Sequence, residues 1–486
     1  MSTPPGTPEH PARPATSPHP ATTRPAPSSR AVTGGAAPLA DPAPLVAAVT
    51  LARADAPAGS AASAEPVVGH PPHPPAPDPG ATGGYRAVFA VREFRTVFAA
   101  HLLSMLGVVV CEIALAVLVY ELSGSPLLSA LTFALGLLPY VVGGTLLSSV
   151  ADRFSARTVL VACDLACAAC AAGMVVPGAP IALLLLLRAT SATIAPVFGG
   201  TRAATLGDIL GTGDLFVLGR SLLRMVAQCS QLVGFGIGGL LLTVVAPRAV
   251  LGLTVATFVA SALLLRYGTR HRPPRAGAGG PVVGASLAGV RRVLGDRRLR
   301  ALLLLAWVPP MFVVAPEALA APYADDLGLG SAGLGLLLVG MPVGAVAGEA
   351  VVGAVCAPRT RERIVLPVAV LATLPALGYL LRPPLPLALA LLVLTGCGIA
   401  YTLGLDQWFV AEVPHELRGR AMTVLTAGLM TVQGLGMALA GAAAEWVPAH
   451  LVVGAAGVLG AVSTLLVAVE VRRTRPGSGS GERPES

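Results

Sequence analysis

Three charged side chains stand deep inside long apolar stretches of this sequence: Glu112, Arg188 and Glu317. A charge at the middle of a membrane-spanning helix costs roughly 2.5–3.5 kcal/mol on insertion scales, so each of them is a functional candidate by default. At about 1.5 Å of rise per residue, Glu112 lies about 22 Å and Arg188 about 18 Å from the inner face of a core about 30 Å thick. The two levels are nearly equal, so if the two helices are neighbours we expect an ion pair that a proton can break.

Glu317 lies 205 positions after Glu112, at the corresponding point of a second series of apolar stretches. Two acids that face each other across a cavity suit proton or cation coupling, because one of two like charges held close together takes up a proton more readily. The alternative is that either acid is protonated and simply hydrogen-bonded to a neighbour. Both interpretations stay open on the sequence alone.

Other reactive side chains form no recognisable site. Cys163, Cys167 and Cys170 share one helical face by their spacing, and a thiol–metal site is conceivable there. Small residues that let helices approach closely are the simpler interpretation. His415 beside Glu416 is the nearest approach to a catalytic pair, but it lies in a short connector between apolar runs. The sequence therefore predicts no catalytic residue, no metal site and no cofactor, and we expect a protein that is not an enzyme.

The elements that must position these charges are helices in a lipid bilayer. Of the 486 residues, 54% are hydrophobic and only 12% are charged, about half the charged share of a soluble domain. All 33 basic residues are Arg, and they stand in short connectors rather than on a basic face with interleaved aromatics. Despite the net charge of +8, this arrangement argues against a nucleic-acid partner.

Residues 1–84 differ from the rest of the chain. They are rich in Pro, Ala, Ser, Thr and Gly and hold no apolar run of spanning length. Such a segment buries too little apolar surface to fold, so we predict disorder. A regulatory tail and an artefact of an upstream start codon both remain open.

After residue 84 the apolar runs reach about 18 to 28 residues, long enough for tilted helices through a bilayer. They predict an all-α membrane protein with twelve transmembrane helices. The spans are 96–122, 126–150, 158–177, 180–204, 221–245, 249–268, 300–321, 331–356, 364–381, 385–411, 421–444 and 450–471.

The distribution of Arg tests this count. Alternate connectors, which would face outward if the N-terminus is cytoplasmic, hold only Arg248 and Arg382. The remaining connectors and the tails hold nearly all the other Arg residues, as the positive-inside rule requires. We therefore expect a multi-pass protein of the cell (plasma or inner) membrane with both termini in the cytoplasm.

The longest inner connector, 269–299, divides the spans six and six. Residues 151–160 lie over 357–366 at an offset of 206, and Gly219-Arg220 lies over Gly419-Arg420 at an offset of 200. Two repeats in the same orientation imply a pseudo-two-fold axis along the membrane normal, with a path between them. The predicted organisation is an N-terminal six-helix bundle (85–268), a basic linker (269–299), a C-terminal six-helix bundle (300–471) and a tail (472–486).

These features resemble the major facilitator superfamily, and within it the bacterial drug, siderophore and secondary-metabolite exporters. The family's loop between helices 2 and 3 carries an Asp-Arg pair followed by basic residues. Asp152, Arg153 and Arg157 match that pattern, although both of its glycine positions hold Ser. The resemblance implies that these three residues form the inner gate.

A second motif lies on helix 5, where the family's antiporters carry Gly-Pro-x-x-Gly-Gly. Gly234, Gly238 and Gly239 keep the glycines, while Phe235 replaces the proline. The resemblance also matches Arg188 to the Arg of helix 4 and residues 413–420 to the loop between helices 10 and 11. Ordinary close packing of helices would explain the glycines equally well.

Together these observations favour a secondary active transporter, monomeric and coupled to protons, whose substrate is a small amphipathic organic molecule. Within this interpretation, the resemblance favours an antiporter for multidrug-type efflux from a largely apolar cavity. An importer of the same fold, a membrane-integral enzyme and a non-transporting sensor are the alternatives. The sequence leaves the substrate, the direction of transport and the coupling ion open.

Overall fold

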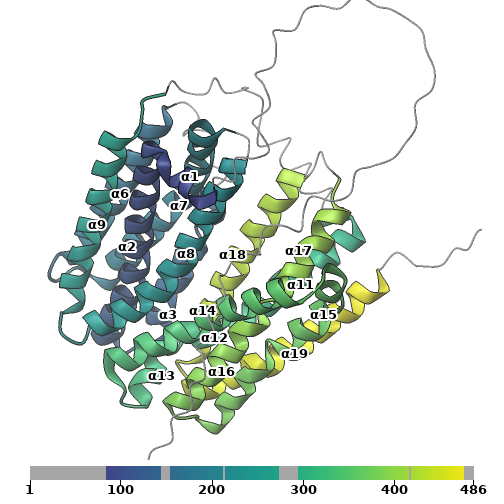
Figure 1. Ribbon diagram of the computed structural model, residues 1–486. Coiled ribbons are helices and arrows are strands. Elements are labelled where there is room, and N and C mark those ends of the chain that lie inside the picture. Colours follow the sequence, from purple (N-terminus) through teal and green to yellow (C-terminus); the bar gives the residue numbers. More distant parts are fainter. Residues whose placement is uncertain (1–83, 144–153, 212–213, 273–293, 415–417, 475–486) are drawn as a thin grey trace, which may run out of the picture. The chain divides into compact units, whose positions relative to one another are not determined.

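The computed structural model describes residues 84–143, 154–211, 214–272, 294–414 and 418–474, and all regular structure within these ranges is helical (Figure 1). These residues belong to one compact unit, His70–Ser486. The predicted disordered segment 1–84 lies outside the described residues except for Gly84. The elements are α1 (Gly84–Ala90), α2 (Arg92–Ser123), α3 (Pro126–Leu137), α4 (Tyr140–Val142), α6 (Ala156–Val175), α7 (Ile181–Leu210), α8 (Asp214–Leu241), α9 (Pro247–Gly268), α11 (Arg297–Val313), α12 (Ala315–Ala318), α13 (Ala320–Asp326), α14 (Gly330–Val355), α15 (Pro358–Leu371), the 3₁₀ helix η2 (Leu374–Leu381), α16 (Leu385–Gly398), α17 (Tyr401–Glu412), α18 (Arg418–Ala443) and α19 (Ala449–Arg473).

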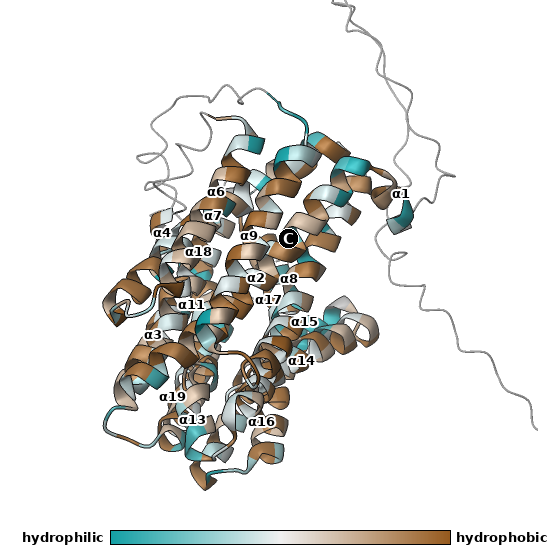
Figure 2. Cartoon of the chain, turned by 90° about the vertical axis from the view of Figure 1, so that its left-hand side faces the viewer, coloured by the Kyte–Doolittle hydropathy of each residue, from teal (hydrophilic) through white to brown (hydrophobic). Residues whose placement is uncertain are grey.

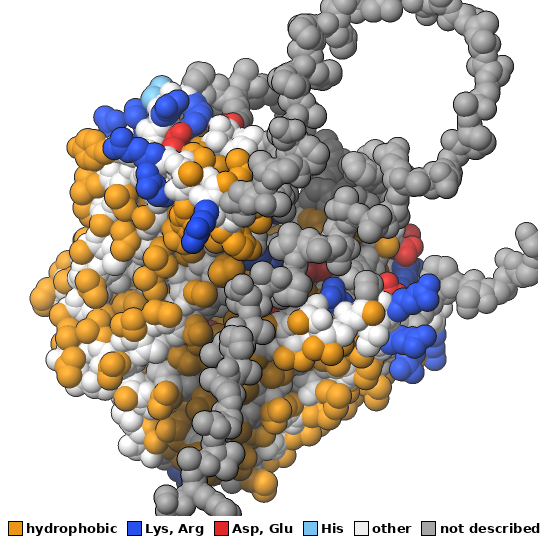
Figure 3. All heavy atoms as spheres, viewed as in Figure 1, with side chains coloured by type: hydrophobic (Ala, Val, Ile, Leu, Met, Phe, Trp, Pro, Cys, Tyr) orange, Lys and Arg blue, Asp and Glu red, His pale blue; other side chains and the backbone are white. Residues whose placement is uncertain are grey.

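Ten helical segments in the described residues are long and apolar enough to cross a bilayer. Figure 2 shows hydrophobic residues along most of the helices, and Figure 3 shows hydrophobic side chains over much of the visible face. Large apolar side chains such as Leu186, Leu240 and Leu466 are more than 60% exposed. Water would penalise such exposure, whereas lipid tails would not. The chain is therefore a multi-pass membrane protein.

Two of the twelve expected spans are not among these ten. The second, 126–150, contains α3, which is too short by itself, and residues 144–150 lie outside the described part. The fifth, 221–245, corresponds largely to α8, whose first half carries Arg220, Arg224 and polar residues that reduce its hydropathy. The count of twelve accordingly stays a prediction.

The turn between α2 and α3 shows how the local sequence sets the helix ends. Gly124 ends α2 with a positive φ of 62°, a left-handed conformation that costs glycine little. Ser125 then caps α3 by accepting a hydrogen bond from the Leu128 N–H, and Pro126 occupies the first turn. This turn brings α3 back along α2.

The helices up to α9 pack into a first group. In it, α2 packs against α9, α8 and α3, and α7 lies between α6 and α3. The second group begins at α11, which packs against α18 and α19, while α14 packs against α16 and α15 against α17. These contacts are compatible with the predicted organisation into two bundles, which remains a prediction.

The seventh expected span is broken. Pro309 and Pro310 lie inside α11, and Pro316 lies in the first turn of α12. Proline provides no N–H and clashes with the preceding turn, so it interrupts the helical hydrogen bonding. As a result, Glu317 sits in a four-residue helix between two longer pieces. In α7, Pro196 is a milder interruption and stands between the two halves of a 30-residue helix.

The two groups meet along two helix pairs, α8 with α14 and α3 with α18. At the first, a Cβ added to Gly239 would lie 2.5 Å from the Gly335 Cα. At the second, a Cβ added to Gly441 would lie 2.5 Å from the Ala130 Cβ. Both helix pairs therefore pack backbone against backbone, which small residues allow and larger ones prevent.

Polar contacts join the groups at one end, which we call the turn end because it holds the α2–α3 turn. Tyr120 in α2 donates a hydrogen bond to the Asp325 carboxylate in α13 (3.3 Å). Glu445, in the connector before α19, accepts hydrogen bonds from the Ser125 hydroxyl and from the Leu127 N–H (3.0 Å). The second group thus caps the N-terminus of α3 with a carboxylate, where the helix dipole favours a negative charge.

We predict that Glu445→Gln weakens closure of the turn end. The hydrogen bonds from Ser125 and Leu127 hold the pKa of Glu445 below its ordinary value of 4.5. The contact is therefore fully present above that value and is lost as the pH falls through the lowered pKa. The carboxylate is exposed, so the population of the open turn end should rise only by roughly two- to fivefold at neutral pH.

Spin-label distances across the turn end, measured from pH 7 to pH 3, would test this. The unmodified protein should open further in the acidic part of the range, and Glu445→Gln should lack that step. Glu121→Gln changes an exposed acid near the same end of α2 and serves as the control. Identical profiles for all three proteins would contradict the prediction.

Candidate functional site

Glu112 of α2 and Arg188 of α7 form a buried ion pair. The Arg188 Nη2 donates to the Glu112 Oε1 at 2.7 Å, and the Arg188 and Glu112 side chains are 8% and 16% exposed respectively. The Arg188 Nε also donates to the Thr132 carbonyl of α3 at 3.2 Å. The expected pairing is thus present, and one guanidinium joins three helices.

Gly136 of α3 provides the space for this pair. A Cβ at this position would collide with the Arg188 Nη2, and it would lie 2.9 Å from the Arg188 Cζ and 3.1 Å from the Glu112 Oε1. The side chain of any other residue would therefore displace the guanidinium. Gly136 lies one turn after Thr132 on the same helix, so α3 supplies both an acceptor and the room for the donor.

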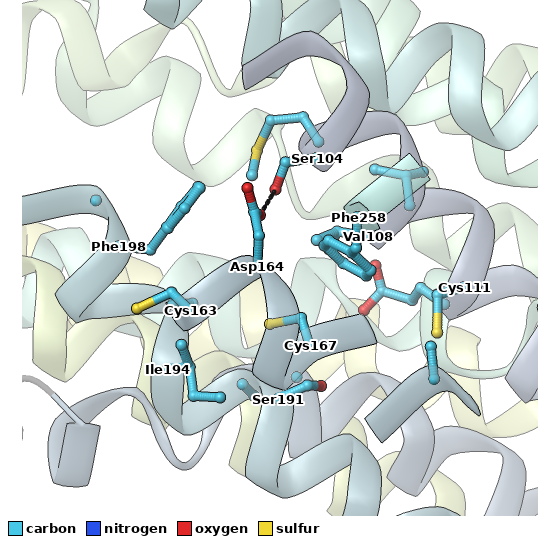
Figure 4. A pocket seen from close by; sticks show the side chains of 18 of the residues that line it. Ser104, Val108, Cys111, Cys163, Asp164, Cys167, Ser191, Ile194, Phe198 and Phe258 are labelled. Atoms are coloured by element: carbon cyan, nitrogen blue, oxygen red, sulfur yellow. Dashed lines mark hydrogen bonds between the residues drawn. The ribbon is translucent and has the colours of Figure 1, made fainter. Parts of the chain in front are cut away.

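A cavity of about 440 Å³ borders this ion pair and lies within the first group. Figure 4 shows several of the side chains that line it, among them Asp164, Phe198 and Phe258. Every residue that lines it belongs to α2, α3, α6, α7, α8 or α9. Its volume lies within the range of small-molecule sites. Apolar and sulfur-containing side chains make up much of the wall, among them Met105, Val108, Cys163, Cys167, Ile194, Phe198 and Phe258.

Asp164 of α6 is a buried acid in the same wall. It is 2% exposed and accepts hydrogen bonds from two serine hydroxyls, Ser104 at 3.3 Å and Ser261 at 2.5 Å. Figure 4 shows the first of these bonds. Two neutral donors thus occupy one oxygen each of the carboxylate, and they tie α6 to α2 and α9.

Arg202 of α7 is the second cation of the cavity and is 7% exposed. Its Nη1 contacts the His101 Nδ1, and its guanidinium lies 4.0 Å from the centre of the Phe198 ring. The other ring nitrogen, Nε2, lies 3.2 Å from the Leu223 carbonyl. Because a carbonyl only accepts and a guanidinium only donates, these contacts define a neutral His101 with its hydrogen on Nε2.

Glu317 is half-buried in α12. It does not line the cavity of the first group, and no hydrogen bond or ion pair joins its carboxylate to another residue in the described ranges. Of the two acids, Glu112 has a cationic partner, whereas Glu317 forms no ion pair in the described part of the chain.

The expected inner gate falls mostly outside the described residues. Asp152 and Arg153 belong to the segment 144–153, of which nothing is described. Arg157, in the first turn of α6, donates a long hydrogen bond of 3.5 Å to the Thr269 carbonyl after α9. This contact lies within the first group, and the gating role of all three residues stays a prediction.

The three glycines of the expected helix-5 motif lie on α8 and have different neighbours. A Cβ at Gly234 would lie 2.8 Å from the Val109 Cβ, and one at Gly238 would lie 2.7 Å from the Ile113 Cγ2, both on α2. Gly239 instead touches Gly335 of α14. Close packing on two sides of α8 thus accounts for all three glycines, and a role in antiport remains a prediction.

Arg202 and Gly136 were not predicted as site residues. Arg202 stands near the end of the expected fourth span, so its depth is not evident from the sequence. It does follow Arg188 by fourteen residues, almost four turns, which places both on one face of the helix and could have identified it. Gly136 has no comparable signal, because only the fold brings it to the ion pair.

A model of the Major Facilitator Superfamily matches residues 97–412 and 311–485. The chain belongs to the major facilitator superfamily. The match spans most of the described helices, including both residues of the buried ion pair. No curated protein matches the chain.

Solved structures of superfamily transporters share the fold. A mutant of the nucleoside transporter NupG has a TM-score of 0.59 and 14% identity. The match covers 78% of this chain and 100% of the NupG chain. A POT family transporter in complex with a thioalcohol-conjugated peptide has a TM-score of 0.62 and 11% identity. The match covers 79% of this chain and 97% of that transporter. A bacterial homologue of the human lysosomal transporter Spinster, inward-facing and unoccupied, has a TM-score of 0.56 and 15% identity. The match covers 80% of this chain and 98% of the homologue.

At these identities the likeness establishes the fold alone. Membership of the superfamily makes this protein a membrane transporter and argues against an enzyme. No group of His, Cys, Asp or Glu in the described part of the chain could hold a metal ion.

We predict that Gly136→Ala impairs transport without altering any titratable group. The added methyl must displace the Arg188 guanidinium, and overpacking of this kind costs about 1–3 kcal/mol. Initial rates of transport in membrane vesicles would measure the loss. The matched control is Gly200→Ala on α7, where an added Cβ has nothing within 4 Å. Equal rates for the two variants would show that the ion pair tolerates the methyl group.

Proposed function

We propose that this protein is a proton-coupled exporter of a small amphipathic organic molecule, working by alternating access. The observation that carries the coupling is the pair of Glu112 and Arg188 at 2.7 Å, largely buried and bordering a cavity. The largely apolar wall of that cavity supports an amphipathic substrate. The motif resemblance to bacterial exporters supports the direction.

Coupling between proton binding and conformational change would arise because protonation of Glu112 removes the ionic partner of Arg188. When Glu112 is ionised, Arg188 has a carboxylate in a poorly hydrated site, where the pair is worth more than in water. A proton on Glu112 removes that attraction and leaves Arg188 held by the Thr132 carbonyl alone. Since Thr132 lies on α3, which packs against α18 of the second group, a change in this contact can be transmitted to the helix pair that joins the groups.

The free energy available from one proton is comparable to the free energy needed to shift the protein between two conformations. One elementary charge moving through the membrane potential gains about 2.3 kcal/mol per 100 mV, to which the pH gradient adds. Moving a two-state protein from one conformation almost completely to the other takes about 5.5 kcal/mol of differential binding. A proton bound in one conformation and released in the other can provide most of this.

Alternating access would use the two helix pairs between the groups. We propose that residues 85–268 and 300–471 move as two bundles connected by the basic linker 269–299, with Asp152, Arg153 and Arg157 closing the inner side. The glycine contacts between α8 and α14 and between α3 and α18 support this, because backbone surfaces without long side chains can slide and tilt with little repacking.

We predict that Glu112→Gln abolishes proton-driven accumulation but retains downhill exchange. The amide keeps the shape of the carboxyl group and can accept a hydrogen bond from Arg188, yet it cannot take up a proton. Uptake into everted vesicles with a panel of dyes and siderophores, with and without a pH gradient, would measure both activities. Arg188→Gln should be impaired in both, because Glu112 then loses its cation.

Glu121→Gln, an exposed acid on the same helix, should behave as the unmodified protein. Accumulation against a gradient by Glu112→Gln would exclude this acid as the coupling site and make Glu317 the next residue to test. Uptake into right-side-out rather than everted vesicles would instead identify an importer.

A further prediction concerns orientation. Because Arg residues concentrate in alternate connectors, residues 269–299 and both termini should lie in the cytoplasm. Cysteine-labelling with a membrane-impermeant maleimide, in a background without the seven native cysteines, would locate each segment. Labelling of the central linker from the periplasmic side would overturn the arrangement.

A further inference from the structure

Arg202 is a buried cation without a complete set of partners. Its Nη2 is shielded from solvent and has no hydrogen-bond partner in the described part of the chain. Arg188, on the same face of the same helix, has both Glu112 and Thr132. Since a buried polar group without a partner costs about 1–3 kcal/mol, and a charged one more, the unused donor at Arg202 requires an explanation.

The nearest acid does not neutralise Arg202 by contact. Asp164 is close enough for its charge to act on the guanidinium. Its two oxygens, however, accept hydrogen bonds from Ser104 and Ser261, and among the described residues it forms no ion pair with Arg202. The remaining neighbours of Arg202 are the neutral ring of His101 and the face of Phe198. Both orient the guanidinium without adding negative charge.

The cavity connects this cation with an apolar chamber. Arg202 and Arg188 lie fourteen residues apart on α7 and both line the cavity, so their Cα atoms are about 21 Å apart along the helix. Ile194 and Phe198 line the cavity from the stretch of α7 between them, and Phe258 lines it from α9. A molecule with one anionic end and an apolar body fits this arrangement.

We propose that the cavity of the first helix group binds an amphipathic organic carboxylate, with the carboxylate at Arg202 and the apolar body against Ile194, Phe198 and Phe258. This assignment names the substrate class of the proposed exporter and rests on that function, but it concerns a site inside one helix group rather than between the two.

The charges favour a monoanion over a dianion such as a phosphate. A phosphate would meet the Asp164 carboxylate beside Arg202, and a single guanidinium offers it no second cation. A carboxylate requires only one cation and is satisfied by one or two N–H donors.

Binding of labelled naphthalene-1-acetate to the purified full-length protein tests the proposal, with the neutral naphthalene-1-acetamide as the matched ligand. The acid should bind more tightly than the amide. Arg202→Gln should weaken binding of the acid by roughly tenfold to a hundredfold, the range for a hydrogen bond to a charged group, and should leave binding of the amide nearly unchanged. Arg202→Lys should restore part of the difference.

Two further variants keep the test decisive. Ile194→Trp fills the chamber without touching a charge, so it should reduce binding of both ligands. Arg266→Gln removes an exposed arginine of α9 and should change neither. Equal binding of acid and amide to the unmodified protein, an equal loss of both in Arg202→Gln, or full binding to Ile194→Trp would each overturn the assignment.

The result is independent of coupling, because binding is measured without a proton gradient. If proton coupling fails and the acid still binds through Arg202, only the proposed mechanism is wrong. If Glu112→Gln behaves as predicted while acid and amide bind alike, the exporter stands and its substrate class is a different one.

Discussion

The arrangement of the first helix group depends on the contacts of the Arg188 guanidinium. It is bonded to a carboxylate of α2 and a carbonyl of α3 while it belongs to α7. Removing either charge would leave the other buried without a partner, which is strongly destabilising in a poorly hydrated interior. The pair thus links the packing of three helices to the protonation of one acid, and under the proposed mechanism stability and transport would depend on the same atoms.

The contacts between the groups complement this charged centre with close approaches at glycines. Gly239 against Gly335, and Gly441 against Ala130, bring helices together through their backbones. Hydrogen bonds then join the groups at the turn end, where Asp325 and Glu445 act as acceptors. Close glycine contacts combined with a few exposed hydrogen bonds are compatible with the proposed movement of the two groups, whereas buried charges join the helices inside the first group.

Part of this could be predicted from the sequence. The membrane location follows from the hydrophobic runs and the scarcity of charge. The nearly equal depths of Glu112 and Arg188 follow from the helical rise, whereas the closeness of their two helices was implied by the family resemblance. The prolines that interrupt the seventh span, Pro309, Pro310 and Pro316, are also visible in the sequence. The fifth span was harder to establish, because Arg220 and Arg224 lower the hydropathy of α8. Gly136 could not be found, since its role depends on which atoms of α2 and α7 face it, and that is a property of the packing.

The proline inside α7 bears on the range of ligands that the cavity can hold. Pro196 stands between Arg188 and Arg202 and deprives the helix of a hydrogen bond at that point. A helix bends most easily where its ladder of hydrogen bonds is interrupted. The spacing of the two guanidinium groups is therefore set by a helix that can bend at Pro196 and not by a straight, rigid one. Under the proposed function, a chamber that can lengthen or shorten at this point would accept molecules of different size.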